Sequence, residues 1–204
     1  MKELKDMSLE ELWELFPIIL EEYNSEYELW YKEECAAIEN SLKDHDIFRI
    51  NHIGSTSVEG MISKPTVDIL LEFPKGYDKG SIVRTLQKEG WMGMAEDDRK
   101  QTVDMNKGYT SEGFAEKVYH LHIRAIGDHG ELYFRDHLRK HPDTAREYEQ
   151  LKLTLKDRFE HDRDAYTMAK TEFVERYTAE ARIEFKGRYD PGNIQDQDFR
   201  INNP

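Results

Sequence analysis

The chain has 204 residues, enough for one domain with a sizeable core, and an aromatic content of 11% argues against disorder throughout. Its formal net charge of −13 disfavours duplex nucleic acid as a partner, because binding it requires a basic face, whereas a pocket for a small phosphorylated ligand needs only a few local cations. A single cysteine, Cys35, excludes an internal disulfide and any multi-cysteine zinc site.

The cellular compartment follows from the lack of apolar runs. No stretch approaches the roughly 18 apolar residues that a membrane span needs, and Met1 to Asp6 lacks the apolar core of a signal peptide. We therefore expect a cytoplasmic protein with no membrane partner, and the oligomeric state stays open. The acidic setting of Cys35 predicts a buried, inert thiol.

The N-terminal part, residues 8–42, has helical periodicity. Ser8 followed three residues later by Glu11 has the capping-box spacing. Pro17 marks a new start rather than a continuation. An aromatic stripe at helical spacing, formed by Tyr23, Tyr27, Trp30 and Tyr31, indicates a helix face on the core.

The middle of the chain changes to the periodicity of strands. Residues 47–54 alternate, and residues 66–73 are nearly all apolar, as in a strand buried on both faces. Residues 78–89 form an amphipathic helix that ends before Gly90. Further strands are expected at residues 91–94, 101–106 and 118–126.

The C-terminal part returns to helical periodicity from 131 to 184, with a break at His141 and Pro142. This predicts a helical hairpin followed by an irregular tail over 185–204. Together the elements predict an α/β (α+β) domain with a small mixed sheet flanked by helices.

The connection between the first two strands holds a candidate phosphate-binding turn. Gly54, Ser55, Thr56 and Ser57 offer backbone N–H groups and three hydroxyls at the end of a strand. Asp68 follows inside a buried strand, where a charge is costly unless it is paired or bound to a metal. The alternative is a structural Ser/Thr turn with Asp68 capping a neighbouring loop.

A second unusual pattern is the pair His120 and His122. On a strand both side chains point to one face together with Arg124, and their backbones lie roughly 6–7 Å apart. They are close enough to share a ligand or a metal with Asp68. A plain polar sheet face is the competing interpretation.

The strand of Asp68 lacks a second carboxylate at the position where a two-metal site needs one. Leu70 shares the face of Asp68 but is apolar, and Glu72 lies too far along the strand to chelate the same ion. Asp104 approaches only if its strand is a neighbour. The sequence therefore does not predict a two-metal site.

Cations complete the candidate site. Lys64 precedes Pro65 in the loop before Asp68, and Arg124 shares a strand with the histidines. Both are expected to contact phosphates. Other cations are expected to be solvated at the surface: Lys107, Arg135, Lys152 and Lys170.

Several spaced motifs resemble those of the GrpB-like family over about residues 20 to 180. The core of the resemblance is Ile53-Gly54-Ser55-Thr56-Ser57-Val58, Gly60-Met61 and Lys64-Pro65-Thr66-Val67-Asp68-Ile69. Matches continue in order with His120-Leu121-His122, Phe134-Arg135-Asp136, His141-Pro142, Tyr148, Leu151-Lys152, Asp162-Arg163-Asp164-Ala165-Tyr166 and Lys170. Glu59 and Ser25 replace family prolines, and Leu70 is usual in the family.

The resemblance implies a nucleotidyltransferase-superfamily fold, in which a Gly-Ser turn holds nucleotide phosphates and acidic residues bind divalent metal. It therefore implies a single such domain over residues 1–184. The activity of the GrpB-like family is unassigned as far as the resemblance goes, so transfer chemistry rests on fold analogy.

Three functional hypotheses follow. The first is a Mg²⁺- or Mn²⁺-dependent nucleotidyl- or phosphoryltransferase acting on a small acceptor, with Asp68, His120 and His122 as catalytic residues and metal ligands. The second is a non-catalytic module that senses a nucleotide or coenzyme phosphate. The third is a two-histidine, one-carboxylate transition-metal site formed by the same three residues, which leaves the Gly-Ser turn without a role.

Overall fold

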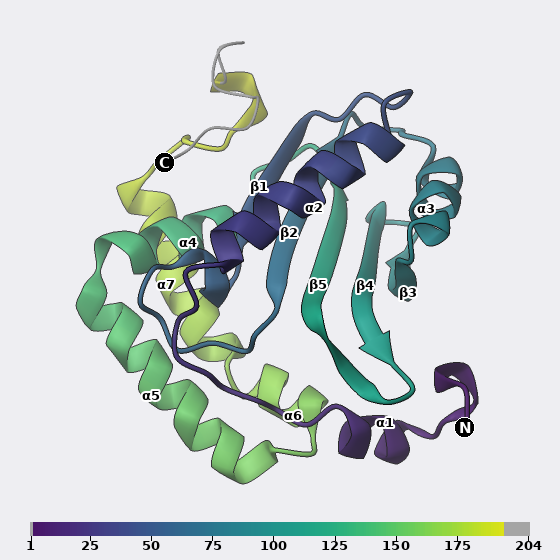
Figure 1. Cartoon of the computed structure of the whole chain (residues 1–204). Coiled ribbons are helices and arrows are strands. Elements are labelled where there is room, and N and C mark those ends of the chain that lie inside the picture. The colour runs from purple at the N-terminus through teal and green to yellow at the C-terminus, as the bar shows by residue number, and fades with distance from the viewer. Residues whose placement is uncertain (1, 194–204) are drawn as a thin grey trace.

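The computed structural model describes residues 2–193 and arranges them around one five-stranded sheet (Figure 1). Neighbouring strands follow the order β1-β2-β5-β4-β3. Strands β2 and β5 are parallel, and every other neighbouring pair is antiparallel. The strand bounds are β1 Arg49–Ile53, β2 Val67–Phe73, β3 Met92–Asp97, β4 Thr102–Thr110 and β5 Gly113–Ala125. The expected α/β class with a small mixed sheet flanked by helices is confirmed.

Helices α2 (Tyr27–Ser41) and α3 (Lys79–Lys88) cover one face of the sheet. The main core lies beneath them, because alternate residues of the strands point to this side. Cys35 lies in this core and is buried, as its acidic helical setting predicts. Other members of this main core are Trp30, Ile38, Val67, Ile69, Leu71, Leu121 and Ile123.

The opposite face is only partly covered. Helices α4 (Gly130–Lys140) and α7 (Thr171–Glu184) pack against each other over the β1 side, where Ile53 and Leu70 meet Leu132. The rest of this face carries polar side chains of β2, β4 and β5. Helices α5 (Pro142–Phe159) and α6 (Arg163–Met168) lie beyond one end of the sheet (Figure 1).

The expected helix over residues 8–42 is interrupted. Helix α1 spans Leu9–Leu15 and has the predicted capping box of Ser8 and Glu11. After it the chain runs without helix to α2, because Pro17 has no N–H for a continuing turn. Within this segment Glu21 pairs with Ser63. Buried Ile18 also fastens it, since its N–H donates to the Glu160 carbonyl at 2.8 Å.

A second difference concerns β5, which begins at Gly113 rather than at 118. Its first residues pair only with β4 in a hairpin, so no continuous apolar run marks them. The C-terminal part has four helices rather than a hairpin, because Asp162 caps a new helix, α6, and a further turn precedes α7.

The described part of the C-terminal tail packs on α4. Tyr189 is buried, and its hydroxyl donates to Asp136 at 2.5 Å and accepts from Arg135 at 2.8 Å. The rest of the expected irregular tail, 194–204, lies outside the described residues. Within residues 2–193 no helix is long and apolar enough to cross a membrane.

Candidate active site

The Gly-Ser turn closes directly onto Asp68. Ile53 is the register partner of Asp68, so the chain leaves β1 beside this carboxylate. Gly54 then adopts a φ of +70°, and a Cβ at this position would lie 2.2 Å from the Asp68 Oδ2 atom. Only glycine fits both the backbone angle and this approach. The turn and the carboxylate are therefore one structural unit.

The three hydroxyls of the turn have different roles. The Thr56 Oγ1 donates to the Thr66 carbonyl at 3.0 Å and lies 3.0 Å from the His52 Nε2. The Ser57 Oγ donates to the Gly54 carbonyl at 2.6 Å. Both side chains are buried and stabilise the turn. Ser55 differs, because its Oγ accepts a hydrogen bond from the Lys152 Nζ at 3.2 Å.

Helix α4 supports the turn from behind. Arg139 donates two hydrogen bonds to the Ser57 carbonyl, at 3.0 and 2.8 Å, and Arg135 donates one to the His52 carbonyl at 3.0 Å. Arg135 was expected at the surface, but it is buried among these acceptors. Both guanidinium groups therefore fix the backbone that carries Gly54 rather than face a ligand.

Three lysines lie close enough to interact with one another, and one of them, Lys152, contacts Ser55. Lys152 is only 2% exposed, and besides Ser55 its ammonium contacts the Ile62 carbonyl. The ammonium groups of Lys64 and Lys170 both lie over the Tyr166 ring, 6.0 and 4.3 Å from its centroid. Surface solvation was expected for Lys152 and Lys170, whereas the fold brings Lys152 to Ser55 and Lys170 into the electrostatic range of Lys64 and Asp68.

The three lysines crowd positive charge in a partly desolvated place. Burial lowers the pKa of Lys152 and of Lys170 to about 7. The Lys64 ammonium adds to this effect at both lysines, whereas the Glu149 carboxylate opposes it at Lys152 and Asp68 opposes it at Lys170. Burial and the nearby Arg163 lower the pKa of Lys64 to about 8. None of these four cations forms an ion pair with a carboxylate in the described part of the chain. Such a group favours an anion.

His120 belongs to a hydrogen-bonded chain that ends on Asp68. The Arg163 guanidinium donates to the Tyr109 hydroxyl at 2.8 Å, and this hydroxyl lies 2.7 Å from the His120 Nε2. Because the ionised Asp68 only accepts, the proton of a neutral His120 ring lies on Nδ1, and Nε2 accepts from Tyr109. The His120 Nδ1 then carries the proton and donates to the Asp68 Oδ1 at 3.2 Å. Burial lowers the pKa of His120, which agrees with this neutral tautomer.

His122 lies between two carboxylates. Its Nδ1 is 2.9 Å from the Asp104 Oδ1, and its Nε2 is 3.8 Å from the Asp68 Oδ1. Burial alone would lower the pKa of His122, but the two carboxylates raise it to about 9. Asp104 also accepts from Arg124 at 2.6 Å. At neutral pH His122 is therefore a fixed positive charge.

Asp68 itself is ionised. Burial would raise the pKa of its carboxyl, but hydrogen bonds and charge from His120 and His122 hold it well below the usual range. Both histidines act on Oδ1. The Oδ2 atom lies against Gly54 and has no hydrogen bond or ion pair among residues 2–193, so this is the oxygen that a ligand can engage.

The expected shared metal site of Asp68, His120 and His122 does not form as three converging ligands. All four ring nitrogens have partners, and the two rings stand at 89° with centroids 6.5 Å apart. In residues 2–193 this trio is not among the groups whose ligand atoms lie within 4.8 Å of one another. One carboxylate with a free oxygen still suits Mg²⁺, which combines one or two carboxylates with substrate phosphates and water.

Of the strand residues Leu70, Glu72 and Asp104, only Asp104 comes close to the candidate site. Leu70 is fully buried against α4 and α7, so the place of a second carboxylate is part of an apolar core. Glu72 forms an ion pair with Arg49 and faces His129, away from Asp68. Asp104 comes close to the site because β4 neighbours β5.

Tyr109 and Arg163 are functional candidates that the sequence patterns did not indicate. Tyr109 lies on the hairpin beyond the expected end of β4, and Arg163 follows the cap of an unexpected helix. A narrow recess beside them is lined by Lys64, Thr66, Phe114 and Arg163, among others. The signal available in the sequence was the match of Asp162-Arg163 to a family motif.

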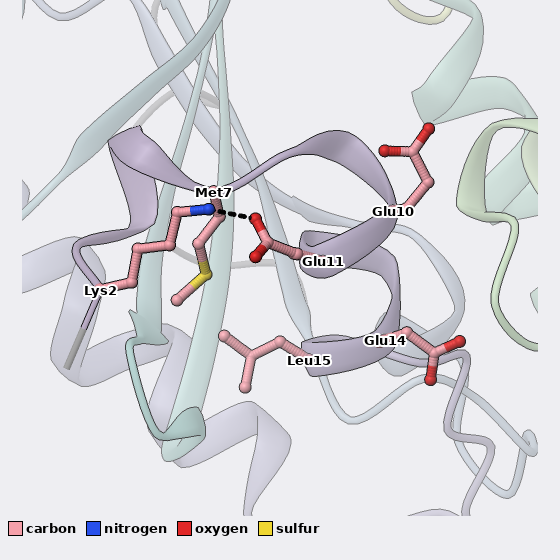
Figure 2. A pocket seen from close by; sticks show the side chains of 6 residues that line it. All are labelled: Lys2, Met7, Glu10, Glu11, Glu14 and Leu15. Atoms are coloured by element: carbon pink, nitrogen blue, oxygen red, sulfur yellow. Dashed lines mark hydrogen bonds and ion pairs between the residues drawn. The ribbon is translucent and has the colours of Figure 1, made fainter.

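A wider, open recess lies at the N-terminal helix instead (Figure 2). Its lining includes Glu10, Glu11 and Glu14, and the Glu11 carboxylate pairs with Lys2 at 2.5 Å. Carboxylates repel phosphate, so this recess does not compete with the turn as an anion site.

Comparisons with known proteins agree with this geometry. A crystal structure of the conserved protein GrpB from Enterococcus faecalis superposes with a TM-score of 0.70 at 26% identity, covering 82% of this chain and 99% of that one. A structure of Cid1 poly(U) polymerase aligns at a TM-score of only 0.46 and 12% identity, which is too weak to bear on function.

Relatives found by sequence include UPF0157 and GrpB proteins. A UPF0157 protein of Pseudomonas aeruginosa is 38% identical over 133 residues, 65% of this chain and 54% of that protein, so the chain spans about half of its length. The glutamate-rich protein GrpB of Alkalihalophilus pseudofirmus is 27% identical over 78% of this chain and 92% of its own. The family model described as GrpB protein matches residues 17–180. This match covers more than half of the chain, so this chain belongs to the GrpB protein family.

Proposed function

We propose that this GrpB-family chain binds a nucleotide by its phosphates at the turn and transfers a phosphoryl or nucleotidyl group to a small acceptor. The observation that carries the proposal is a set of cations close to one another and to Asp68: Lys152, which contacts Ser55, together with Lys64, Lys170 and Arg163. They lack carboxylate partners in the described chain and lie beside ionised Asp68, although the whole chain has a net charge of −13. Local cations of this kind match a polyphosphate.

The lysines and the turn would bind the phosphates. The Ser55 hydroxyl and the backbone N–H groups after Gly54 supply donors at one end, and the Lys64 and Lys170 ammonium groups offset charge. A bound anion favours the charged form of each lysine, so binding draws protons onto groups with pKa values of about 7 to 8.

Asp68 would act as an oxygen ligand rather than as a base. Its low pKa makes it a weak proton acceptor but keeps it charged, and its Oδ2 faces the turn. If Mg²⁺ or Mn²⁺ is bound there together with phosphate oxygens, the ion neutralises charge on the transferred group. His120 and His122 hold the Asp68 Oδ1, which fixes the direction of the free oxygen.

The histidines therefore have positioning roles in this proposal, in place of the roles as catalytic residues and metal ligands expected from the sequence. His120 receives a proton from Tyr109 and donates one to Asp68, so neither of its nitrogens is free. His122 is charged between two carboxylates. Catalysis would rest on positioning and electrostatic stabilisation, which is sufficient for phosphoryl transfer.

A test of binding uses ATP, GTP, CTP and UTP, each with Mg²⁺ or Mn²⁺, titrated calorimetrically. The variants are Asp68→Asn and Lys152→Met, and the control is Lys88→Ala on the far side of the sheet. We expect the Lys152→Met change to weaken binding at least about 10-fold, whereas Asp68→Asn removes the part that depends on the divalent ion. No nucleotide bound by the unmodified chain in any combination would refute the proposal.

A second candidate function is non-catalytic sensing of a nucleotide or coenzyme phosphate. It is favoured by Leu70, which leaves the strand of Asp68 with one carboxylate on the site. Turnover separates the two functions. Loss of labelled γ- or α-phosphate from bound nucleotide, offered with sugar, amine and hydroxyl acceptors, supports transfer. Tight binding with no product over hours supports sensing.

A further inference from the structure

Helix α4 carries a second group of polar side chains near its C-terminal end. His137 lies in the last turn of α4 and His141 follows four residues later at the junction with α5. Their ring centroids are 4.2 Å apart. Glu184, the last residue of α7, faces both rings. One ligand atom from each of the three side chains lies within 4.8 Å of the other two.

The two oxygens of Glu184 have separate partners. Its Oε1 pairs with the Lys140 ammonium at 2.7 Å. Its Oε2 lies 2.8 Å from the His141 Nε2 and 3.6 Å from the His137 Nδ1. Ligand atoms around a tetrahedral zinc ion are roughly 3.3 Å apart, which follows from metal–ligand bonds of about 2.0 Å. The spacing of this trio is therefore close to that of a coordination sphere.

His137 is the independent sign that a ligand belongs here. The residue is 5% exposed, and both of its ring nitrogens are buried without a hydrogen-bond partner among residues 2–193. Buried polar atoms nearly always have a partner, because an unmet one loses its hydration without replacement. Burial also lowers the pKa of His137, so the ring is neutral and offers a lone pair.

We propose that His137, His141 and Glu184 bind one divalent transition-metal ion of the zinc, cobalt or nickel type. Two imidazoles and one carboxylate suit these ions, whereas Mg²⁺ and Ca²⁺ prefer oxygen ligands alone. Three protein ligands leave a fourth position for water. Histidines four residues apart at a helix end present their nitrogens to one side.

The site is distinct from the candidate active site but coupled to it through α4. Arg135 and Arg139 project to the turn, whereas His137 and His141 are offset from them by two residues and face α7. A bound ion would cross-link the end of α4 to the end of α7. The metal would therefore stabilise the helix pair that supports Gly54 and Ser57.

The test titrates Co²⁺ into the chain carrying Asp68→Asn, which removes the other candidate metal ligand. We expect one Co²⁺ per chain with the visible absorption of a four-coordinate ion, displaced by one equivalent of Zn²⁺. His141→Gln and Glu184→Gln should each weaken binding at least about 10-fold. The control is Glu180→Gln, a carboxylate one turn earlier on α7, which should bind Co²⁺ as the background does.

Thermal unfolding gives a second readout. Zn²⁺ should raise the unfolding midpoint of the background and of the Glu180→Gln control, but not that of the Glu184→Gln variant. Because His137 is buried, His137→Gln serves only if it folds, and the two partly exposed ligands carry the test. Failure of the background to bind Co²⁺, or equal binding in the ligand variants and the control, would overturn the proposal.

Discussion

Lys152→Met tests whether the candidate site has been kept at the expense of stability. Lys152 is 2% exposed, and its ammonium contacts the Ser55 hydroxyl and the Ile62 carbonyl but no carboxylate in the described residues. Methionine keeps most of the length of the stem and removes the charge. We expect the variant to be more stable than the unmodified chain at pH 7 and to lose affinity for nucleotide.

The magnitude follows from the pKa. Lowering the pKa of Lys152 from 10.5 to about 7 corresponds to an upper limit of about 5 kcal/mol for burying the charged form. The variant also loses two hydrogen bonds, each worth about 1 kcal/mol. Replacement of buried charges by apolar residues of similar volume has stabilised proteins by about 1–4 kcal/mol. We therefore expect a gain of about 1–3 kcal/mol at pH 7.

The lowered pKa of Lys152 determines how the stability difference between the two proteins changes with pH. The pKa of Lys152 is lower in the folded chain than in the unfolded chain. The free-energy cost of burying its charge is therefore complete below pH 7 and disappears as the pH rises toward 10. Urea unfolding of both proteins at pH 7 and pH 9.5 should show the advantage of the variant shrinking at the higher pH. A variant that is less stable at pH 7, or an advantage independent of pH, would refute the reasoning.

Three further predictions concern other parts of the site. Gly54→Ala should lower the free energy of unfolding by about 2–4 kcal/mol and abolish nucleotide binding, because it adds a clash with the Asp68 carboxylate to a backbone strain of about 1–3 kcal/mol. Leu70→Asp should cost about 3–5 kcal/mol without adding activity, because position 70 lies in an apolar cluster. Asp104→Asn should lower the pKa of His122 below about 9, and NMR titration of the His122 ring in both proteins would measure the shift.

Each of these has its own control or contrary result. Gly76→Ala has a φ of +80° and open space, so it isolates the backbone strain, and equal losses at both glycines would exclude the clash. Transfer activity gained by Leu70→Asp would contradict the buried apolar role of that position. Because the pKa of His122 is raised on folding, its charged ring stabilises the fold fully below pH 6.5, and this stabilisation is lost as the pH rises through 9. In the Asp104→Asn variant the free energy of unfolding should fall less between pH 6.5 and 9.

Local patterns were sufficient to predict most strands and the turn, but not the order of the strands. The apolar run around Asp68 predicted a buried strand, whereas its antiparallel pairing with β1, which places Gly54 beside the carboxylate, is seen only in the structure. The interruption near Pro17 was indicated, but the extended path after it was not, because it depends on Glu160 and Ser63 from distant segments. Nonlocal partners of this kind leave no periodicity in the sequence.

The positions of the cations could likewise be predicted only in part from the sequence. Lys64 was predicted because it is close to Asp68 in sequence. Lys152 and Lys170 lie on α5 and just before α7, where an acidic, highly charged helix sequence is typical of a solvated surface. The burial of Lys152 and the partial burial of Lys170 depend on how these helices fold back over the end of the sheet. The histidines were predicted to share one face, but their partners Tyr109 and Asp104 depend on the strand order.

The most direct test of the central claim is a crystal structure of the chain with a nonhydrolysable ATP analogue and Mg²⁺. The proposed function predicts phosphate oxygens within hydrogen-bonding distance of Ser55 and of the Lys64, Lys152 and Lys170 ammonium groups, with the ion on the Asp68 Oδ2. An analogue bound elsewhere, with the three lysines contacting no phosphate, would contradict it.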